Sequence, residues 1–149
     1  MDELPALTLI AADGSPLPLA SLRGRPAVLY FYPKDDTSGC TREAQDFSRL
    51  GADFERAGVR VFGVSKDSPD SHQRFAGKHQ LEVGLASDET GAACEAFGVW
   101  VEKSMYGKKY MGIDRSTFLF DAEGRLSRAW RKVKVPGHAE EVLAAARAL

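Results

Sequence analysis

Cysteine is scarce in this chain of 149 residues, which holds only Cys40 and Cys94. Two cysteines cannot build a disulfide framework, and the absence of a Cys-x-x-Cys pair argues against a zinc site. No apolar run approaches the roughly 20 residues that cross a bilayer, and the acidic segment Met1–Pro5 is unlike a secretory signal. We therefore expect a cytoplasmic protein in which each thiol can be considered separately.

Charge of one sign is also lacking, because 20 Lys and Arg residues against 21 Asp and Glu give a formal net charge of −1. Such a chain has no general positive field for nucleic acid or an anionic membrane. The three histidines, His72, His79 and His138, show no metal-ligand spacing with each other or with the cysteines. We expect no metal, no cofactor, no nucleic acid and no membrane partner, and we expect His72 and His79 on a solvated helix face.

Alternating strand and helix patterns predict an α/β fold for one domain that spans residues 1–149. Three apolar runs are typical of buried strands: Pro26–Tyr32, Val59–Ser65 and Ser116–Asp121. A turn at Gly124 and a following strand, Arg125–Arg131, indicate a hairpin after the last run. Together these elements predict a mixed central β-sheet flanked by helices.

Helical patterns fill the intervals between the runs. Apolar residues at three- and four-residue spacing predict one helix over residues 40–57, ended by Gly58. Ser68 followed by Pro69 is typical of a helix start and predicts a second helix to about Lys78. Two further helices are expected: a short one capped by Asp88 or Thr90 and ended by Gly98, and a C-terminal one from about His138.

Cys40 stands where a polar loop, Pro33–Gly39, gives way to the first helix. A helix N-terminus offers unpaired N–H groups and the positive end of the helix dipole, and both favour a thiolate. A small core residue in the first helical turn is the alternative interpretation. Full ionisation of an ordinary thiol at pH 7 raises its thiolate fraction by at most roughly 30-fold.

The segment Pro33-x-x-x-Thr37-x-x-Cys40-x-x-Glu43 resembles the active-site signature of the peroxiredoxins. Further matches to the peroxiredoxin Q branch, also called bacterioferritin comigratory proteins, are Phe31–Lys34, Gly39–Thr41, Leu85–Asp88, Phe97–Trp100 with Glu102 and Lys103, and Gly112–Asp121. The resemblance implies a thioredoxin-like fold and a thiol-dependent peroxidase that reduces hydrogen peroxide and organic hydroperoxides. It gives the peroxidatic role to Cys40 and matches Thr37, Pro33 and Arg115 to the other active-site positions, with Glu43 at the acidic position one turn into the helix.

The chemistry of these side chains fits such a reaction. Arg115 is a permanent cation suited to the sulfur and the leaving oxygen, and Thr37 can accept from the peroxide while donating to sulfur or oxygen. Backbone N–H groups near Gly39 and Cys40 add donors, and Pro33 supplies an apolar wall without an N–H. Taken alone, Thr37 could be only a helix cap, Pro33 only a strand end and Arg115 only a solvated charge.

The route by which the sulfenic acid is reduced depends on a second thiol. Relatives of this branch often carry a cysteine five residues after the first or in the next helix, but here Gln45 and the segment Arg74–Lys78 stand at those places. We expect a one-cysteine cycle in a monomer, with an external thiol such as thioredoxin or glutaredoxin, and a vulnerability of Cys40 to sulfinic overoxidation.

Two alternatives to this cycle stay open. Cys94, the only other thiol, has a packing role on the apolar face of a short helix or serves as an intramolecular resolver. The second alternative is a peroxide sensor that passes oxidation of Cys40 to a partner through a mixed disulfide. A thioredoxin-like disulfide reductase is disfavoured because Cys-x-x-Cys is absent.

Basic and aromatic residues gather between Trp100 and Tyr110, in a stretch expected to be a long loop. Its lysines, Lys103, Lys108 and Lys109, could border the active-site entrance or contact a partner. Met105 and Met111 could pack near the thiol pocket or elsewhere in the core or loop.

Overall fold

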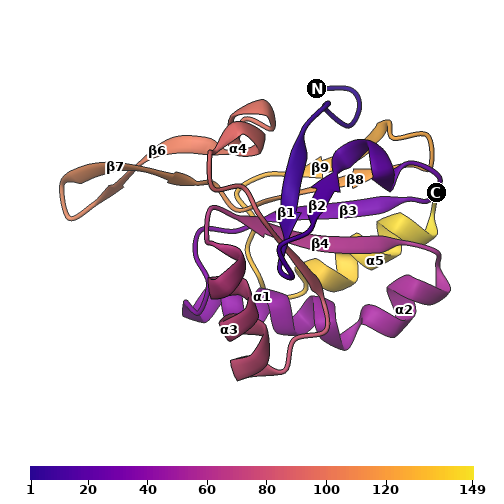
Figure 1. Cartoon of the computed structure of the whole chain (residues 1–149), viewed down its shortest axis with the longest axis horizontal. Helices are drawn as coiled ribbons and strands as arrows, with labels where there is room; N and C mark the ends of the chain where they lie inside the picture. Colours follow the sequence, from indigo (N-terminus) through magenta and orange to yellow (C-terminus); the bar gives the residue numbers. More distant parts are fainter.

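A seven-stranded mixed β-sheet forms the centre of the computed structural model, which describes all residues 1–149 (Figure 1). The strand order is β2-β1-β5-β4-β3-β8-β9. The parallel centre consists of β3 (Ala27–Phe31), β4 (Arg60–Ser65) and β5 (Gly84–Ser87). The antiparallel flanks are β1 (Thr8–Ala11) with β2 (Pro16–Pro18), and β8 (Ser116–Phe120) with β9 (Leu126–Trp130).

The sheet divides the core into two compartments, because successive side chains of a strand point to opposite faces. On β3, Val28 and Tyr30 face one compartment, while Leu29 and Phe31 face the other. The first compartment is covered by α1 (Ser38–Arg49), α2 (Gly51–Arg56), α3 (Pro69–His79) and α5 (His138–Arg147), which gather on one side of the sheet in Figure 1. The second is covered by the N-terminal segment, the 3₁₀ turn η1 (Leu19–Leu22) and α4 (Ala92–Ala96).

Several sequence predictions are confirmed by these elements. The three apolar runs form β3, β4 and β8, and the hairpin partner of β8 is β9. Helix α3 begins after Ser68, whose hydroxyl accepts a hydrogen bond from the Ser71 N–H, and α5 begins at His138. A mixed central sheet flanked by helices is thus confirmed. None of the helices is both long enough and apolar enough to span a bilayer.

The prediction of one helix over residues 40–57 is wrong. Helix α1 starts two residues earlier, at Ser38, and α2 follows after a break at Leu50, whose φ of −91° and ψ of 5° depart from helical values. Leu50 is buried and is followed by Gly51, a poor helix former. The break keeps Phe47 of α1 and Phe54 of α2 in the same compartment, which is why their spacing resembled a single stripe.

The stretch expected to be a long loop is instead a β-hairpin. Strands β6 (Trp100–Met105) and β7 (Lys108–Ile113) form a separate two-stranded sheet that projects from the body (Figure 1). Tyr106 and Gly107 both have positive φ, as a two-residue hairpin turn requires. Met105 and Met111 are exposed on this hairpin, so the alternative that they pack in the core is wrong.

Candidate active site

Cys40 is the third residue of α1 and is 2% exposed, in the compartment that also holds Tyr30. Thr37 occupies the N-cap position of α1, but its side chain accepts no hydrogen bond from the helix. The Thr37 hydroxyl instead donates to the Lys34 carbonyl oxygen, at 2.9 Å. The first turn of α1 therefore has no side-chain cap, and the acceptor lone pairs of the Thr37 oxygen face no protein donor.

Arg115 reaches Cys40 from the loop between β7 and β8. Its Nη2 donates to the Cys40 Sγ at 3.3 Å, and its Nη1 donates to Glu43 Oε1 at 2.6 Å. Burial alone would lower the pKa of Arg115, but the charges and hydrogen bonds of Glu43 and Cys40 outweigh burial and raise it. With its side chain 16% exposed, this residue is a largely buried permanent cation and not a solvated charge.

Glu43 lies one helical turn after Cys40 and is buried. Burial raises the pKa of Glu43 to about 7, although Arg115 acts in the opposite direction. Its Oε2 atom has no hydrogen-bond partner. The site thus holds a carboxyl group that changes protonation near neutral pH, next to the guanidinium that contacts the sulfur.

Two glycines make room for these side chains. A Cβ atom at Gly39 would lie 3.2 Å from Arg115 Nη2, so glycine lets the guanidinium cross the first turn of α1. A Cβ atom at Gly63 of β4 would lie 2.5 Å from the ring of Tyr30, which explains glycine in that strand. Burial, together with the charges of Glu43 and Cys40, raises the pKa of Tyr30, so its unpartnered hydroxyl stays neutral.

Sequence reasoning did not single out Tyr30 beside the thiol. Its position could have been inferred from strand alternation, since residues of β3 on the face opposite Phe31 point towards α1. Pro33, which follows β3, is partly buried at the start of the loop that leads to Thr37. Of the hairpin lysines, Lys103 lies near enough to Arg115 and Cys40 to respond to their charges, and burial lowers its pKa.

Cys94 lies in the other compartment, with the central sheet between it and Cys40. It is 0% exposed, and neither cysteine forms a disulfide. The Asp88 carboxylate accepts hydrogen bonds from the N–H groups of Ala93 and Cys94, at 3.1 and 2.8 Å. Burial raises the pKa of the Cys94 thiol well above its ordinary value, and Asp88 raises it further. The prediction named Asp88 or Thr90 as the cap, and both accept from the first turn, Thr90 from the Ala92 N–H at 3.3 Å, while the N-cap residue itself is Gly91.

His72 is fully buried, so the prediction of a solvated face for it is wrong. It shares its face of α3 with the buried Phe75, three residues further on, and hydrogen bonds satisfy its ring nitrogens. The three-residue spacing between His72 and Phe75 could have indicated that His72 lies on the buried face of the helix. His79 is partly exposed and contacts Asp36.

The mixed sheet and a buried arginine beside a thiol in the first turn of a helix are the features expected of a thioredoxin-like thiol peroxidase. The chain belongs to the AhpC/TSA family, whose model matches residues 1–129. It is 49% identical to peroxiredoxin Bcp of Xanthomonas campestris, over 98% of this chain and 94% of the relative. It is 48% identical to peroxiredoxin Bcp of Bacillus subtilis, over 93% of this chain and 88% of the relative.

Solved structures agree with this relationship. The chain superposes on the bacterioferritin comigratory protein of Xanthomonas campestris with a TM-score of 0.92 and 49% identity, covering 98% of this chain and 96% of the other. The resemblance to the peroxiredoxin Q branch and the thioredoxin-like fold are thereby confirmed. The protein is a thiol-dependent peroxidase.

Proposed function

We propose that Cys40 is the peroxidatic cysteine and that it reduces hydrogen peroxide and organic hydroperoxides through a sulfenic acid. The observation that carries this proposal is the hydrogen bond from Arg115 Nη2 to the Cys40 Sγ, at the uncapped start of α1. A buried cation at this distance favours negative charge on sulfur. The bacterioferritin comigratory protein of Xanthomonas campestris, on which this chain superposes, has alkyl peroxide reduction activity, and this supports organic hydroperoxides as substrates here.

In the oxidation step the Cys40 thiolate attacks one peroxide oxygen of ROOH. An S–O bond forms, the O–O bond breaks, and the leaving RO⁻ takes up a proton, so the products are Cys40–SOH and ROH. Arg115 donates to the sulfur, and in this proposal its guanidinium stabilises negative charge as it moves from the sulfur to the leaving oxygen. The N–H groups of Gly39 and Cys40 add donors at the start of the helix.

Thr37 and Pro33 orient the peroxide in this proposal. The proton of the Thr37 hydroxyl is engaged by the Lys34 carbonyl, so the hydroxyl oxygen accepts from the O–H of the peroxide. The donor role that the sequence also allowed for Thr37 would require this bond to break. Pro33 provides an apolar wall that has no N–H to compete for the substrate.

The cycle closes with an external thiol. A reductant R′SH attacks the sulfenic sulfur, water leaves, and a second reductant thiol releases Cys40 from the mixed disulfide. Cys94 is separated from Cys40 by the sheet, and Gln45 and Arg74–Lys78 offer no alternative thiol. These facts support a one-cysteine cycle with a thioredoxin or glutaredoxin type of reductant.

Peroxide consumption by the wild type, Cys40→Ser and Cys94→Ser tests the proposal, with thioredoxin, glutaredoxin and dithiothreitol as separate donors. We expect loss of turnover only in Cys40→Ser. Equal activity of Cys40→Ser and the wild type would refute the assignment of Cys40. Mass spectrometry after one equivalent of peroxide should show Cys40 as a sulfenic acid or a mixed disulfide, whereas a Cys40–Cys94 disulfide would refute the one-cysteine cycle.

The same assays separate an enzyme from a sensor. Repeated turnover with a thiol donor supports the peroxidase, whereas one turnover followed by a stable adduct with a partner protein would favour the sensor. We further propose that the protein works in the cytoplasm, because a one-cysteine cycle draws on a pool of reduced thiols. We also propose that it is a monomer. Light scattering across a range of concentrations tests the monomer.

A further inference from the structure

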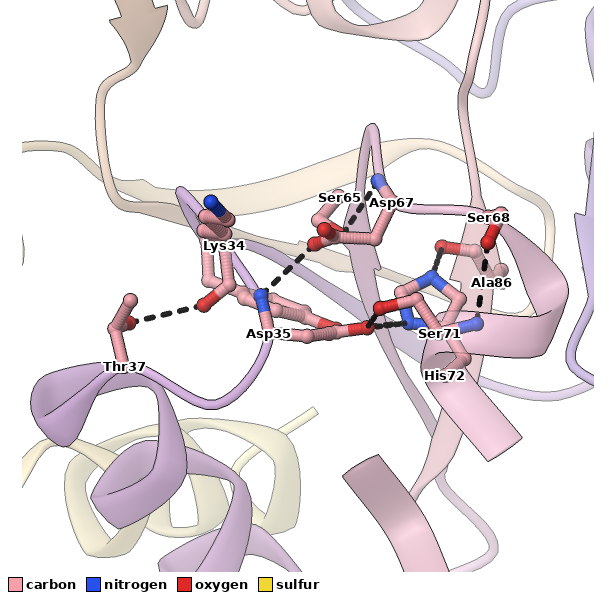
Figure 2. A network of polar contacts seen from close by, with 10 residues as sticks. Lys34, Asp35, Thr37, Ser65, Asp67, Ser68, Ser71, His72 and Ala86 are labelled. Atoms are coloured by element: carbon pink, nitrogen blue, oxygen red, sulfur yellow. Dashed lines mark hydrogen bonds and ion pairs between the residues drawn. The ribbon is translucent and has the colours of Figure 1, made fainter. Parts of the chain in front are cut away.

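The loop that leads to the thiol, residues 33–37, is attached to α3 by a buried carboxylate. Asp35 is nearly inaccessible to solvent, and its Oδ2 atom lies 2.8 Å from His72 Nδ1 and accepts from the Ser71 hydroxyl at 2.8 Å (Figure 2). Its Oδ1 atom accepts from the Tyr32 hydroxyl at 2.5 Å. The Asp35 N–H donates to Asp67 Oδ2 at 2.8 Å, so the backbone of the 33–37 loop is held as well.

The hydrogen-bond partners of the two ring nitrogens indicate which protonated form of His72 pairs with Asp35. Its Nε2 atom lies 3.0 Å from the Ala86 carbonyl oxygen, which can only accept, so Nε2 carries a hydrogen. Its Nδ1 atom faces Asp35, and an ionised carboxylate also only accepts. Burial opposes ionisation of Asp35, but hydrogen bonds from His72, Tyr32 and Ser71 outweigh it and hold the pKa of Asp35 below its ordinary value. Nδ1 also lies 3.3 Å from the Tyr32 hydroxyl, which can donate or accept. The doubly protonated ring of His72 is the form that donates to Asp35 and Ala86 together, and in that form Asp35 and His72 are a buried ion pair.

A second, exposed attachment joins the 33–37 loop to the end of α3. Asp36 has a φ of 60°, in the left-handed region, and its carboxylate lies 2.7 Å from both Lys78 Nζ and His79 Nε2. Exposed ion pairs contribute little because water and salt screen them. Asp36 therefore offers a matched control: it is in the same loop, with the same charge and the same partner helix, but it is solvated.

Opening of this loop matters because the two half-reactions need different access to Cys40. Peroxide is small enough to enter a closed site, whereas a protein thiol must bring its own sulfur into bonding contact with a residue that is 2% exposed. The loop ends at Thr37 and runs directly into the first turn of α1. A cleft of about 350 Å³ between the loop and α3 borders Asp35, Asp36 and Ser71, so water has access to the outer side of the attachment.

We propose that the Asp35–His72 ion pair is a positioning element that holds the 33–37 loop closed, favouring oxidation of Cys40 by peroxide and opposing its reduction by a protein thiol. The proposal rests on the proposed role of Cys40. His72 and Asp35 act through Thr37 and the start of α1 and do not touch the reacting atoms. Their effect therefore has opposite signs in the two half-reactions, which a loss of overall stability would not produce.

Stopped-flow kinetics of Asp35→Asn tests whether oxidation and reduction of Cys40 change in opposite directions. Asparagine keeps the shape but removes the charge, and loss of one charge-assisted hydrogen bond corresponds to about a tenfold change. We expect oxidation of Cys40 to slow by about tenfold and reduction by thioredoxin to accelerate by a similar factor, with reduction by dithiothreitol changed less. Asp36→Asn should leave both rates within about twofold of the wild type.

A parallel fall in both half-reactions of Asp35→Asn, no change in either, or an equal effect of Asp36→Asn would overturn the proposal. NMR of the unmodified protein gives a readout that needs no variant and no activity. The proposal requires that both ring nitrogens of His72 carry hydrogens in the folded protein at neutral pH. An unprotonated ring nitrogen would refute the ion pair. If Cys40→Ser instead keeps wild-type turnover, the proposed function fails, and the NMR result still decides the charge of His72.

Discussion

Cys40 and Cys94 occupy the same place in two helices and have opposite surroundings. Each is the third residue of its helix and each is buried, one in α1 and one in α4. At α1 the sulfur faces the Arg115 guanidinium and the helix start has no side-chain cap. At α4 the Asp88 carboxylate takes the N–H groups of the first turn, and the pKa of Cys94 is raised by burial and by this carboxylate.

The difference between the two thiols shows that the same position in a helix can place a sulfur beside a cation or beside a carboxylate. The macrodipole contribution at an exposed helix start is worth about 1 kcal/mol or less. What differs is the side chain that competes for the N–H groups and the charge placed against the sulfur. Changing one of these features at a time should therefore separate their effects.

The largest effect is expected from Arg115→Gln, which removes the cation and makes the surroundings of Cys40 more like those of Cys94. Loss of a preorganised donor to a developing charge typically costs about 10²–10³ in rate, and we expect that loss in the peroxide oxidation of Cys40. Stopped-flow fluorescence or competition against a second peroxidase measures it. Arg131→Gln, an arginine bonded to the Phe97 and Gly98 carbonyls, is the control and should stay near the wild-type rate.

The next largest effect is expected in the free energy of unfolding and concerns Glu43, the carboxyl group near Cys40. The pKa of Glu43 is raised by burial to about 7 in the folded state from an ordinary value of 4.5. Between these values the folded state binds more protons than the unfolded state, so stability falls as pH rises, by about 3 kcal/mol at most. Glu43→Gln should flatten this part of the pH profile in denaturant titrations. The exposed Glu95→Gln is the control, and an unchanged slope in Glu43→Gln would contradict the assignment.

Thr37→Val tests whether a hydroxyl acceptor at the start of α1 contributes beyond shape. Valine removes both the acceptor for peroxide and the bond to the Lys34 carbonyl, and we expect oxidation of Cys40 to slow by about tenfold. Thr37→Ser keeps the hydroxyl and should recover most of the rate. Equal rates in the valine and serine variants would show that the hydroxyl has no such role.

The smallest effect is expected at the other thiol. Asp88→Asn removes the carboxylate that raises the pKa of Cys94, so alkylation of Cys94 in a Cys40→Ser background should occur at lower pH and a few-fold faster. Peptide mapping after timed alkylation measures it. Asp121→Asn is matched, because Asp121 also accepts from two backbone N–H groups, and it should leave Cys94 unchanged.

Sequence reasoning succeeded where one local pattern decides the outcome. Apolar runs indicated the buried strands because both faces of a central strand need hydrophobic residues. It failed where contacts distant in sequence decide. The break at Leu50 leaves Phe47 and Phe54 in one compartment, so the spacing of apolar residues does not reveal it. The β6–β7 hairpin is mostly exposed and lacks a buried face to impose alternation. His72 was misplaced because a buried polar residue is satisfied only by partners such as Asp35 and Ala86.

In the candidate site, too, residues close in sequence were predicted, whereas contacts between distant residues were not. The order of Thr37, Cys40 and Glu43 along the chain was enough to match a family signature. The contact of Arg115 with Cys40 joins residues 75 positions apart, so it came from the resemblance and not from local pattern. Nothing in the residues alone indicated that the sheet would separate Cys94 from Cys40.

The projecting hairpin has a consequence for the protein in concentrated solution. Strands β6 and β7 pair only with each other, so both outer edges offer free backbone groups, and Tyr106 at the tip is 99% exposed. Such edges invite pairing between molecules, and a net charge of −1 provides little long-range repulsion against it. Lys103, Lys108 and Lys109 lie on these two strands, and lysines on an exposed strand oppose such pairing between molecules.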